Sequence, residues 1–478
     1  MQTYKMWIGG KWVDAHSSKT FATINPSTGE EICLVPWADA TDVDNAVKAA
    51  RAAFRVWSKK TQAERSKVLV KIAEAIRANA DELAKMEGLE HGTPYRDAFG
   101  VAMGAADKFE YSAGIAPTLM GEHIPVKDGT LSYLQREPAG VIGFIIPWNL
   151  PTIMTAVKLA PAIAVGNTCV LKPPSINSII GLKFAEIFSK VDMPAGVINI
   201  ITGPGGSVGS AMATHPDIDM IGFTGSSETG KQILADASKT CKKCVMELGG
   251  NNPVIIMDDA DLDASLKVLA WRQFNNSGQH CSGPGRYYVH EKVYDAFIEK
   301  YIAYAKTVAV GNPVDKEITM GPVVSKEHQK NVEAYIKKGV EEGARLVFGA
   351  DKPEALKKGF FVMPTILVDC THNMTVAREE IFGPVAVILK YTDKDDIVAL
   401  ANDSPYGLCA HVWTRNIERG MQMVNDLHVG SVFINCQMLT NEQPWGTSVK
   451  ESGIGKEGSR HGMAEFTDLK LVCINYNV

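Results

Sequence analysis

Hydrophobic residues recur at helical spacing in the first part of the chain. Over residues 41–57 apolar positions fall three or four residues apart, which predicts an amphipathic helix that starts with a capping box of Thr41 and Asp44. A second helical pattern begins at Gln62 and ends near Gly88, a natural helix terminator. Short alternating stretches before these helices predict antiparallel strands over residues 5–13 and 20–25.

From residue 140 to residue 248, short apolar runs alternate with segments of helical period. The runs are VIGFII, TCVLK, VINII, MIGF and VMEL. Such alternation predicts parallel strands joined by right-handed helical crossovers. A second alternating series, over residues 253–435, includes VIIM, RYYVH and VAVILK. We therefore expect an α/β fold with two α/β units in tandem.

A different pattern interrupts the helical region between residues 119 and 137. Two alternating runs meet there at Asp128-Gly129, which is a hairpin signal. We expect this hairpin to project from the body of the protein.

Length and composition favour a globular protein that binds small molecules. A chain of 478 residues is too long for one ordinary core, so two or three compact units are expected. Hydrophobic residues make up 45% and charged residues 22% of the chain, and the net charge is only −5 without any block of like charges. This argues against nucleic acid or a membrane as the main partner.

The N-terminus and the cysteines bear on location. The first residues lack a basic segment followed by an apolar core, and the longest apolar tract, residues 156–170, is broken by Lys158, Pro161 and Asn167. We therefore expect neither an export signal nor a membrane span. The nine cysteines are an odd number without framework spacing, so we expect a reducing, cytoplasmic location.

Cys281 is the strongest candidate for a reactive side chain. It lies in FNNSGQHCSGPGR, residues 274–286, between a helical pattern over 262–274 and a strand pattern over 286–290. The small and polar neighbours predict a loop between two ordered elements. A thiol on such a loop is accessible, as a nucleophile must be.

Two further polar residues stand at predicted strand ends. Glu247 ends the run VMEL, and a carboxylate there should have a raised pKa, which suits a general base; capping is the structural alternative. Asn149, in PWNLP, could donate to a developing oxyanion or could simply cap a turn.

The first α/β unit also contains features typical of nucleotide sites. The stretches GPGGSVG (203–209) and GFTGSSETG (222–230) each lie between a strand and a helix, where backbone amides can approach a phosphate, although tight turns have the same composition. Lys172 at the end of TCVLK could hold a ribose or phosphate, or could be merely solvated.

Six motifs occur in one order along the whole chain: PWN, KPP, FTGS, ELGG, FNNSGQHC and EEIFGPV. Together they resemble the NAD(P)-dependent aldehyde dehydrogenases of the hydrolytic, non-acylating type. The resemblance implies a Rossmann-like cofactor domain, a second α/β catalytic domain and a small β oligomerisation arm. The implied boundaries are 1–118 and 139–249 for the NAD(P)-binding domain, 250–449 for the catalytic domain, and 119–138 and 465–478 for the arm.

The resemblance also implies roles for single residues. Cys281 would be the nucleophile, Glu247 the general base, and Asn149 the oxyanion donor together with the backbone amide of Cys281. Glu457 would lie near the path of the catalytic water. The implied cofactor-binding residues are Trp148, Lys172, Ser175, Gly205, Gly225, Ser226, Glu380 and Phe382. The implied substrate-binding residues are Leu150, Met154, Val157, His280, Ser282, Leu439 and Trp445.

These residue types suit the oxidation of an aldehyde to a carboxylic acid. An aldehyde carbon cannot donate hydride until it is tetrahedral, so the thiolate of Cys281 adds first and Asn149 stabilises the alkoxide. After hydride transfer to the nicotinamide, water activated by Glu247 hydrolyses the thioester. A free thiol, with a pKa of about 8.5, is mostly protonated at neutral pH, so the positive ring of the cofactor could help to ionise it.

Three other functions fit these residues less well than aldehyde oxidation does. CoA-acylating relatives typically lack the glutamate of ELGG, whereas this chain has Glu247. A thiol amidase or protease would need His280 as the base for Cys281, but adjacent residues seldom point toward each other. A structural, lens-type protein without turnover would not need the catalytic residues named above.

A metal site is not expected. Cys241 and Cys244 form a CxxC pair, but no second pair or HxxxH accompanies them, and zinc needs four ligands. On a strand the two side chains would also point in different directions, so packing is the better interpretation.

Departures from the family pattern bear on the cofactor, the substrate and the assembly. Ser175 stands where NAD-preferring relatives commonly have a glutamate, so NADP should be tolerated, while the preference stays open. His280 and Ser282 add polar groups to a tunnel without large aromatics at Leu150 and Val157, which favours a medium-sized, aromatic or polar aldehyde. The 128–129 hairpin and the final run DLKLVCINYNV match the family's oligomerisation arm, which predicts a homodimer or homotetramer.

Overall fold

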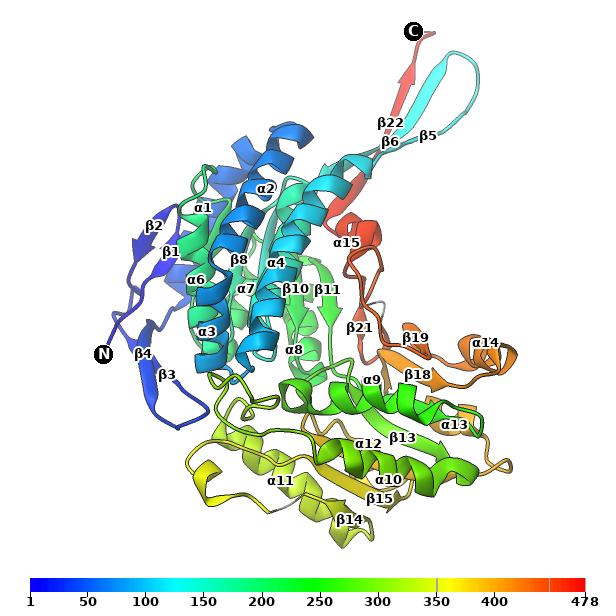
Figure 1. Ribbon diagram of the computed structural model, residues 1–478. Helices are drawn as coiled ribbons and strands as arrows, with labels where there is room; N and C mark the ends of the chain where they lie inside the picture. The colour runs from blue at the N-terminus through cyan, green and yellow to red at the C-terminus, as the bar shows by residue number, and fades with distance from the viewer. Residues whose placement is uncertain (350, 447, 478) are drawn as a thin grey trace.

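Two large sheets organise the chain in the computed structural model, which describes residues 1–349, 351–446 and 448–477 (Figure 1). Residues 350 and 447 of the predicted catalytic domain and residue 478 of the predicted arm lie outside these ranges. The first sheet contains, from edge to edge, β2 (Lys11–Val13), β1 (Met6–Ile8), β9 (Ile198–Ile200), β8 (Thr168–Lys172), β7 (Val141–Ile145), β10 (Met220–Thr224), β11 (Lys243–Glu247) and β21 (Gly453–Ile454).

The five central strands of this sheet, β9 to β11, run parallel, as the alternating pattern predicts. Their side chains alternate between two cores: Val141 and Ile145 of β7 belong to one, Ile142 and Phe144 to the other. Helices α1 (Ala40–Trp57), α7 (Ser210–Thr214) and α8 (Ser227–Ala237) cover the first face. The second face packs on α5 (Pro151–Ala164) and α6 (Ile179–Phe188), with α2 (Gln62–Ala78), α3 (Ala80–Glu90) and α4 (Tyr95–Ile115) outside them.

The second sheet is also parallel except for β14 at its edge. Its strands are, in order, β14 (Arg345–Phe348), β15 (Thr365–Cys370), β16 (Val385–Tyr391), β13 (Pro284–His290), β12 (Asn252–Ile256), β18 (Cys409–Trp413) and β19 (Ser431–Ile434). One face packs on α9 (Leu262–Phe274) and α10 (Tyr294–Ala305). The other packs on α11 (Lys326–Glu341), α12 (Thr375–Arg378), α13 (Ile397–Asn402) and α14 (Ile417–Asp426). The predicted α/β class is therefore confirmed.

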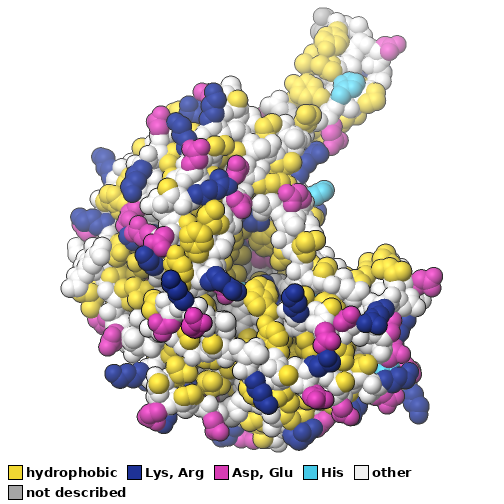
Figure 2. Space-filling model, viewed as in Figure 1, with side chains coloured by type: hydrophobic (Ala, Val, Ile, Leu, Met, Phe, Trp, Pro, Cys, Tyr) yellow, Lys and Arg dark blue, Asp and Glu magenta, His cyan; other side chains and the backbone are white. Residues whose placement is uncertain are grey.

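A three-stranded antiparallel sheet projects from the body (Figure 1, Figure 2). It consists of β5 (Glu122–His123), β6 (Thr130–Pro138) and β22 (Thr467–Asn475). The turn at Asp128-Gly129 is present, and Gly129 has a φ of +77°, which glycine adopts without strain. The first strand of the hairpin is only two residues long.

The segment between the predicted catalytic domain and the predicted arm was assigned to neither. It forms β20 (Val449–Lys450), which pairs with β17 (Tyr406–Gly407), then β21 and α15 (Ser459–Glu465). Because β21 pairs with the end of β11, the chain returns to the first sheet near its C-terminus.

Three local predictions were wrong. Residues 5–13 form two strands, β1 and β2, because Gly9 and Gly10 adopt positive φ and turn the chain. The strand predicted over 20–25 is present as β3 (Thr20–Ile24), which pairs antiparallel with β4 (Glu31–Pro36). The capping box of α1 is Asp39 with Asp42, because the helix starts at Ala40 and both Thr41 and Asp44 lie within it.

The predicted helix from Gln62 to Gly88 is two helices. Asn79 leaves the helical conformation with a φ of −111° and ends α2, while its side chain bonds to the carbonyl of Ala75 at 2.7 Å. Helix α3 then continues through Gly88, and Gly92, with a φ of +99°, supplies the left-handed residue after it. Within the ranges given above, no helix is both long and apolar enough to cross a membrane.

Candidate active site

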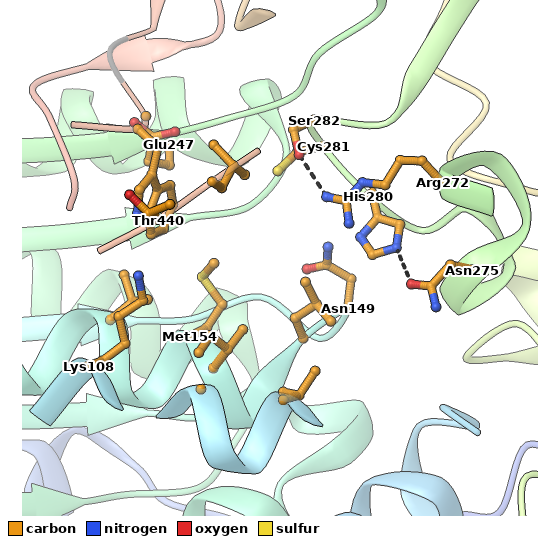
Figure 3. Close-up of a pocket in the computed structure, with 18 of the residues that line it drawn as sticks. Lys108, Asn149, Met154, Glu247, Arg272, Asn275, His280, Cys281, Ser282 and Thr440 are labelled. Atoms are coloured by element: carbon orange, nitrogen blue, oxygen red, sulfur yellow. Dashed lines mark hydrogen bonds between the residues drawn. The ribbon is translucent and has the colours of Figure 1, made fainter. Parts of the chain in front are cut away.

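Cys281, Asn149 and Glu247 line one cavity of about 700 Å³. The cavity opens between α4, α5, α9 and the segment over residues 439–446. Figure 3 shows the three side chains around the same space. The nucleophile comes from the loop between α9 and β13 of the second sheet and the carboxylate from β11 of the first sheet, so both sheets are needed to form the site.

The backbone holds Cys281 from several sides. Asn276 and Ser277, in the turn after α9, have left-handed φ angles of +51° and +56°. The side-chain Nδ2 of Asn252 donates to the backbone carbonyl of Cys281 at 2.7 Å. Burial, with the charges of Glu247 and Glu380, raises the pKa of the Cys281 thiol to about 12. In the protein without cofactor the thiol is therefore protonated at neutral pH.

Asn149 lies at the end of the β7 to α5 connection and is oriented by the cysteine loop. Its Nδ2 donates to the carbonyl of Gln279 at 3.0 Å, and its own carbonyl accepts from Asn276 Nδ2 at 2.8 Å. His91 Nε2 contacts Asn276 Oδ1 at 2.9 Å from below. A primary amide has two N–H groups, so Asn149 keeps one for a group bound in the cavity.

Glu247 is the last residue of β11 and is 5% exposed. Ser448 Oγ donates to its Oε1 at 3.4 Å. Lys158 and Glu457 form a buried ion pair close enough for both charges to act on the carboxylate of Glu247. Burial and the charge of Glu457 raise the pKa of Glu247 well above its usual value, so the predicted direction is confirmed.

All seven predicted substrate-binding residues line the cavity that contains Cys281. They are Leu150, Met154, Val157, His280, Ser282, Leu439 and Trp445. The Trp445 ring also packs against Lys108, whose Nζ lies 5.5 Å from the ring centroid. Among the described residues no hydrogen bond joins His280 to Cys281; the His280 Nε2 contacts Asn275 Oδ1 at 3.2 Å instead.

The predicted cofactor-binding residues lie outside this cavity, at strand ends and loops. Lys172 ends β8, is buried, and donates to the carbonyl of Pro173 at 3.0 Å, and burial lowers its pKa to about 8. Ser175 Oγ donates to the carbonyl of Gly203 at 2.8 Å. Gly225 follows β10, and Ser226 caps α8 by accepting from the Thr229 amide at 3.3 Å.

The remaining cofactor candidates lie beside the cysteine loop. Trp148 packs edge-on against Phe382, with ring centroids 5.3 Å apart. Glu380 accepts from the Gly250 amide at 3.1 Å, and burial raises the pKa of its carboxyl to about 8.

The loops of the first sheet suit a dinucleotide. A side chain at Gly205 would meet nothing within 4 Å, so the π-helical turn that it begins, Gly205–Gly209, borders open space. At Gly225 a Cβ would lie 2.4 Å from the Phe223 ring, so only glycine fits there. Open parallel sheets bind nucleotides at such strand ends, with phosphates at a helix N-terminus like that of α8.

Sequence reasoning did not identify several residues of the site. Arg272 lines the cavity, but it stands within a helical pattern that predicts scaffold. Asn252 and Asn276 hold the cysteine loop and Asn149 through side-chain amides. Asparagine in a predicted loop next to a nucleophile is a signal that could have singled out Asn276.

The CxxC pair does not form a metal site in the structure. Cys241 is exposed with a φ of +53°, whereas Cys244 lies in β11. Searched over the described residues, the chain has no group of three or more His, Cys, Asp or Glu side chains arranged to hold a metal ion.

Comparison with known proteins supports the interpretation of this geometry. The model of the aldehyde dehydrogenase family matches residues 12–472. Mitochondrial aldehyde dehydrogenase of Mesocricetus auratus is 41% identical over 476 residues, which are 98% of this chain and 95% of the relative.

Solved structures agree over the whole length. An aldehyde dehydrogenase from Bacillus cereus in complex with NAD+ is 39% identical with a TM-score of 0.96, covering 99% of this chain and 97% of that one. An NADP-dependent enzyme of E. coli is 36% identical with a TM-score of 0.96, covering 99% of this chain and 98% of that one. The chain therefore belongs to the aldehyde dehydrogenase family, whose general reaction is the oxidation of aldehydes to acids with NAD(P).

Proposed function

We propose that this protein oxidises an aldehyde to a carboxylic acid through a covalent intermediate on Cys281. The observation that carries the proposal is that Cys281, Asn149 and Glu247 line one cavity, although they are far apart in the sequence. A nucleophile, an oxyanion donor and a base of raised pKa are the groups that this reaction needs.

The first step is addition of the Cys281 sulfur to the aldehyde carbon. The thiol gives up its proton to solvent water, the C–S bond forms as the C=O π bond opens, and the carbonyl oxygen becomes the oxyanion of a thiohemiacetal. The free N–H of Asn149 and the backbone amide of Cys281 donate to this oxyanion. Addition is easier from the thiolate, and Arg272 opposes the burial that keeps the thiol protonated.

Bound NAD(P)+ supplies the hydride acceptor, and the residues proposed to hold it are Trp148, Lys172, Ser175, Gly205, Gly225, Ser226, Glu380 and Phe382. After oxidation the acyl group is a thioester on Cys281. Glu247 takes a proton from water, the resulting hydroxide adds to the acyl carbon, and the C–S bond breaks. The products are the carboxylic acid and the free cysteine.

Two finer features of the function follow from side chains near the site. Because Ser175 carries no charge, it would not repel a 2′-phosphate, so we expect NADP to be tolerated beside NAD. The seven residues that line the cavity, with polar groups at His280 and Ser282, fit a medium-sized, aromatic or polar aldehyde.

The proposed arrangement extends to the whole chain. We assign cofactor binding to residues 1–118 and 139–249, catalysis to 250–449, and assembly into a homodimer or homotetramer to 119–138 and 465–478. All nine cysteines are free, which suits a reducing compartment such as the cytoplasm.

Replacing the nucleophile tests the proposal. Cys281→Ala should abolish aldehyde-dependent formation of NAD(P)H, measured at 340 nm, while NAD(P) binding, measured by calorimetry, persists. Cys409→Ala is the matched control, since Cys409 lines the same cavity and is given no role in the reaction. Aldehyde oxidation by the Cys281→Ala protein would overturn the assignment.

A further inference from the structure

We propose that Arg272 binds an anionic group of the substrate, so that the preferred aldehyde carries a carboxylate. This inference rests on the proposed function and makes the substrate class more specific. It starts from a cation in the substrate cavity, whose charge also favours the thiolate of Cys281 but which forms no bond in the proposed steps.

Arg272 lies in the last turn of α9 and lines the cavity beside the nucleophile. Figure 3 shows its side chain extending from the helix toward Ser282 and Cys281. One nitrogen, Nη2, donates to Ser282 Oγ at 2.9 Å. The Nε–H is buried and has no hydrogen-bond partner among the described residues. A buried donor without a partner costs free energy, so it marks a place where a ligand would be favourable.

No protein anion balances this guanidinium. Arg272 forms no ion pair with any residue that the structure describes, and the ionisable groups whose charge acts on it are the thiols of Cys281 and Cys409. Burial raises the pKa of both thiols, that of Cys281 to about 12, so neither is charged at neutral pH. Arg272 is partly buried, and a partly buried cation without a counter-ion favours a bound group that supplies the negative charge.

The other cations of the cavity differ from Arg272. Arg96 lies 3.8 Å from the Asp97 carboxylate. Lys108 is influenced by the charges of Glu457, Glu442 and Asp107, which partly offset its own. Arg272 is therefore the cavity cation best placed to attract an anion.

His280, next to Arg272, is not its counter-ion either. Burial and the charge of Arg272 lower the pKa of His280 well below its usual value, so the ring is neutral. Asn275 donates its Nδ2 to Asp97, which directs its Oδ1 toward His280 Nε2. In this network Nε2 carries the proton, and the buried Nδ1, which has no partner among the described residues, is an acceptor.

The position of Arg272 limits the length of the substrate. Its guanidinium contacts the side chain of the residue that follows the nucleophile, so the carboxylate must lie only a few atoms from the aldehyde carbon. A guanidinium can bind a carboxylate through two parallel hydrogen bonds, which gives both strength and orientation. Short semialdehydes of dicarboxylic acids have this shape, and succinic semialdehyde is a suitable probe.

The test compares succinic semialdehyde with its uncharged methyl ester, methyl 4-oxobutanoate. We expect wild type to have the higher kcat/KM for the semialdehyde. In Arg272→Met the ratio of the two kcat/KM values should fall by about tenfold to a hundredfold, because a charged hydrogen-bonding group is lost. Arg272→Lys keeps the positive charge but lacks the planar guanidinium that donates two parallel hydrogen bonds. Its ratio of kcat/KM for the semialdehyde to kcat/KM for the ester should lie between those of wild type and Arg272→Met. Arg96→Met is the matched control, and its ratio should change less than that of Arg272→Met.

Two results would overturn the inference. Wild type could fail to prefer the semialdehyde over the ester. Arg272→Met could lower both kcat/KM values equally, which would mean that Arg272 only supports the cysteine loop or the thiolate. If wild type oxidised neither compound nor any aldehyde of a wider panel, the proposed function itself would fail.

A binding measurement decides the question independently of turnover. Succinate should raise the thermal midpoint of wild type more than dimethyl succinate does, and this difference should disappear in Arg272→Met. Equal shifts from the two compounds in wild type would contradict the inference even if aldehydes are oxidised.

Discussion

Glu247, the proposed general base, shows how the fold changes the proton affinity of a single side chain. Burial and the charge of Glu457 make its carboxyl hold a proton more tightly than an exposed glutamate does. A base of this kind accepts a proton from water near neutral pH, where an ordinary carboxylate would be too weak. The charge of the nearby Lys158 opposes this rise in the pKa of Glu247.

Glu247→Gln should separate the two halves of the reaction. Glutamine cannot accept a proton, so thioester hydrolysis should slow by about a hundredfold or more, while the first hydride transfer survives. Stopped-flow absorbance should then show a burst of NAD(P)H close to one equivalent per active site. Ser448→Ala, which removes only the 3.4 Å hydrogen bond to this carboxylate, serves as the control and should change turnover less. Loss of cofactor binding in Glu247→Gln would instead show that the residue has another role.

At the scale of elements, helix α3 carries two buried carboxylates. Glu90 accepts hydrogen bonds from the Ile179 amide at the start of α6, where a helix favours negative charge. Neither carboxylate oxygen of Glu87 has a hydrogen bond of ordinary geometry among the described residues, although Thr152 lies near enough to oppose the rise of its pKa. Burial raises the pKa of Glu87 to about 7 and that of Glu90 to about 8.

Glu87 should make the stability of the protein depend on pH. Its pKa is raised from 4.5 to about 7 on folding, so stability is lost as the pH rises from about 4.5 to about 7 and stays lower above that range. Glu87→Gln cannot ionise, so it should raise the thermal midpoint at pH 8 by a few degrees relative to wild type and change it little at pH 5. Glu74→Gln, at an exposed position of α2, should shift the midpoint equally at both pH values. An equal shift at both pH values for Glu87→Gln would contradict the prediction.

The elements also show what the sequence alone can predict. The parallel strands were predicted because buried strands read as continuous apolar runs separated by helical segments. The boundary between α2 and α3 was not predicted. Asn79 ends α2 through its backbone φ angle and a side-chain hydrogen bond to the carbonyl of Ala75, and neither feature changes the spacing of hydrophobic residues. The strand β21 was missed because two residues are too few to give a pattern, and its pairing with β11 joins distant parts of the chain.

As with the secondary structure, part of the candidate site was predictable from the sequence and part was not. Cys281, Asn149 and Glu247 stand in loops or at strand ends, and the structure brings them to one cavity. Arg272 escaped prediction because its side chain is presented to the cavity by a helix that otherwise packs against the second sheet. A charged residue within a helical pattern is usually on the solvent-exposed face of the helix. Only the fold shows that Arg272 lines the cavity instead.

At the scale of the whole molecule, the projecting sheet is the most exposed structure. Strand β22 is its edge, nine residues long, and carries Leu469 and Leu471 at 53% and 61% exposure. A long edge strand with exposed apolar side chains is a template for pairing with another chain. This supports the proposal that the sheet is an oligomerisation arm.

Replacing both leucines should therefore reduce the size of the assembly. Leu469→Glu with Leu471→Glu should lower the molar mass in light scattering after gel filtration, from a dimer or tetramer toward the mass of one chain, because charge opposes burial of this edge. Ile417→Glu is the control, since Ile417 is 63% exposed on α14, away from the arm. An unchanged mass for the double variant would rule out this surface as the interface.

The return of the chain to β11 sets the order in which the protein can become active during synthesis. Ribosomes deliver the nucleophile and its oxyanion donor well before residues 439–446, which close the cavity, and before Gly453, which pairs with Glu247. A nascent chain of that length therefore has the five parallel strands of the first sheet and the cysteine loop, but it lacks β21 and the segment that lines the far side of the cavity. We expect aldehyde oxidation only from chains that extend past Gly453.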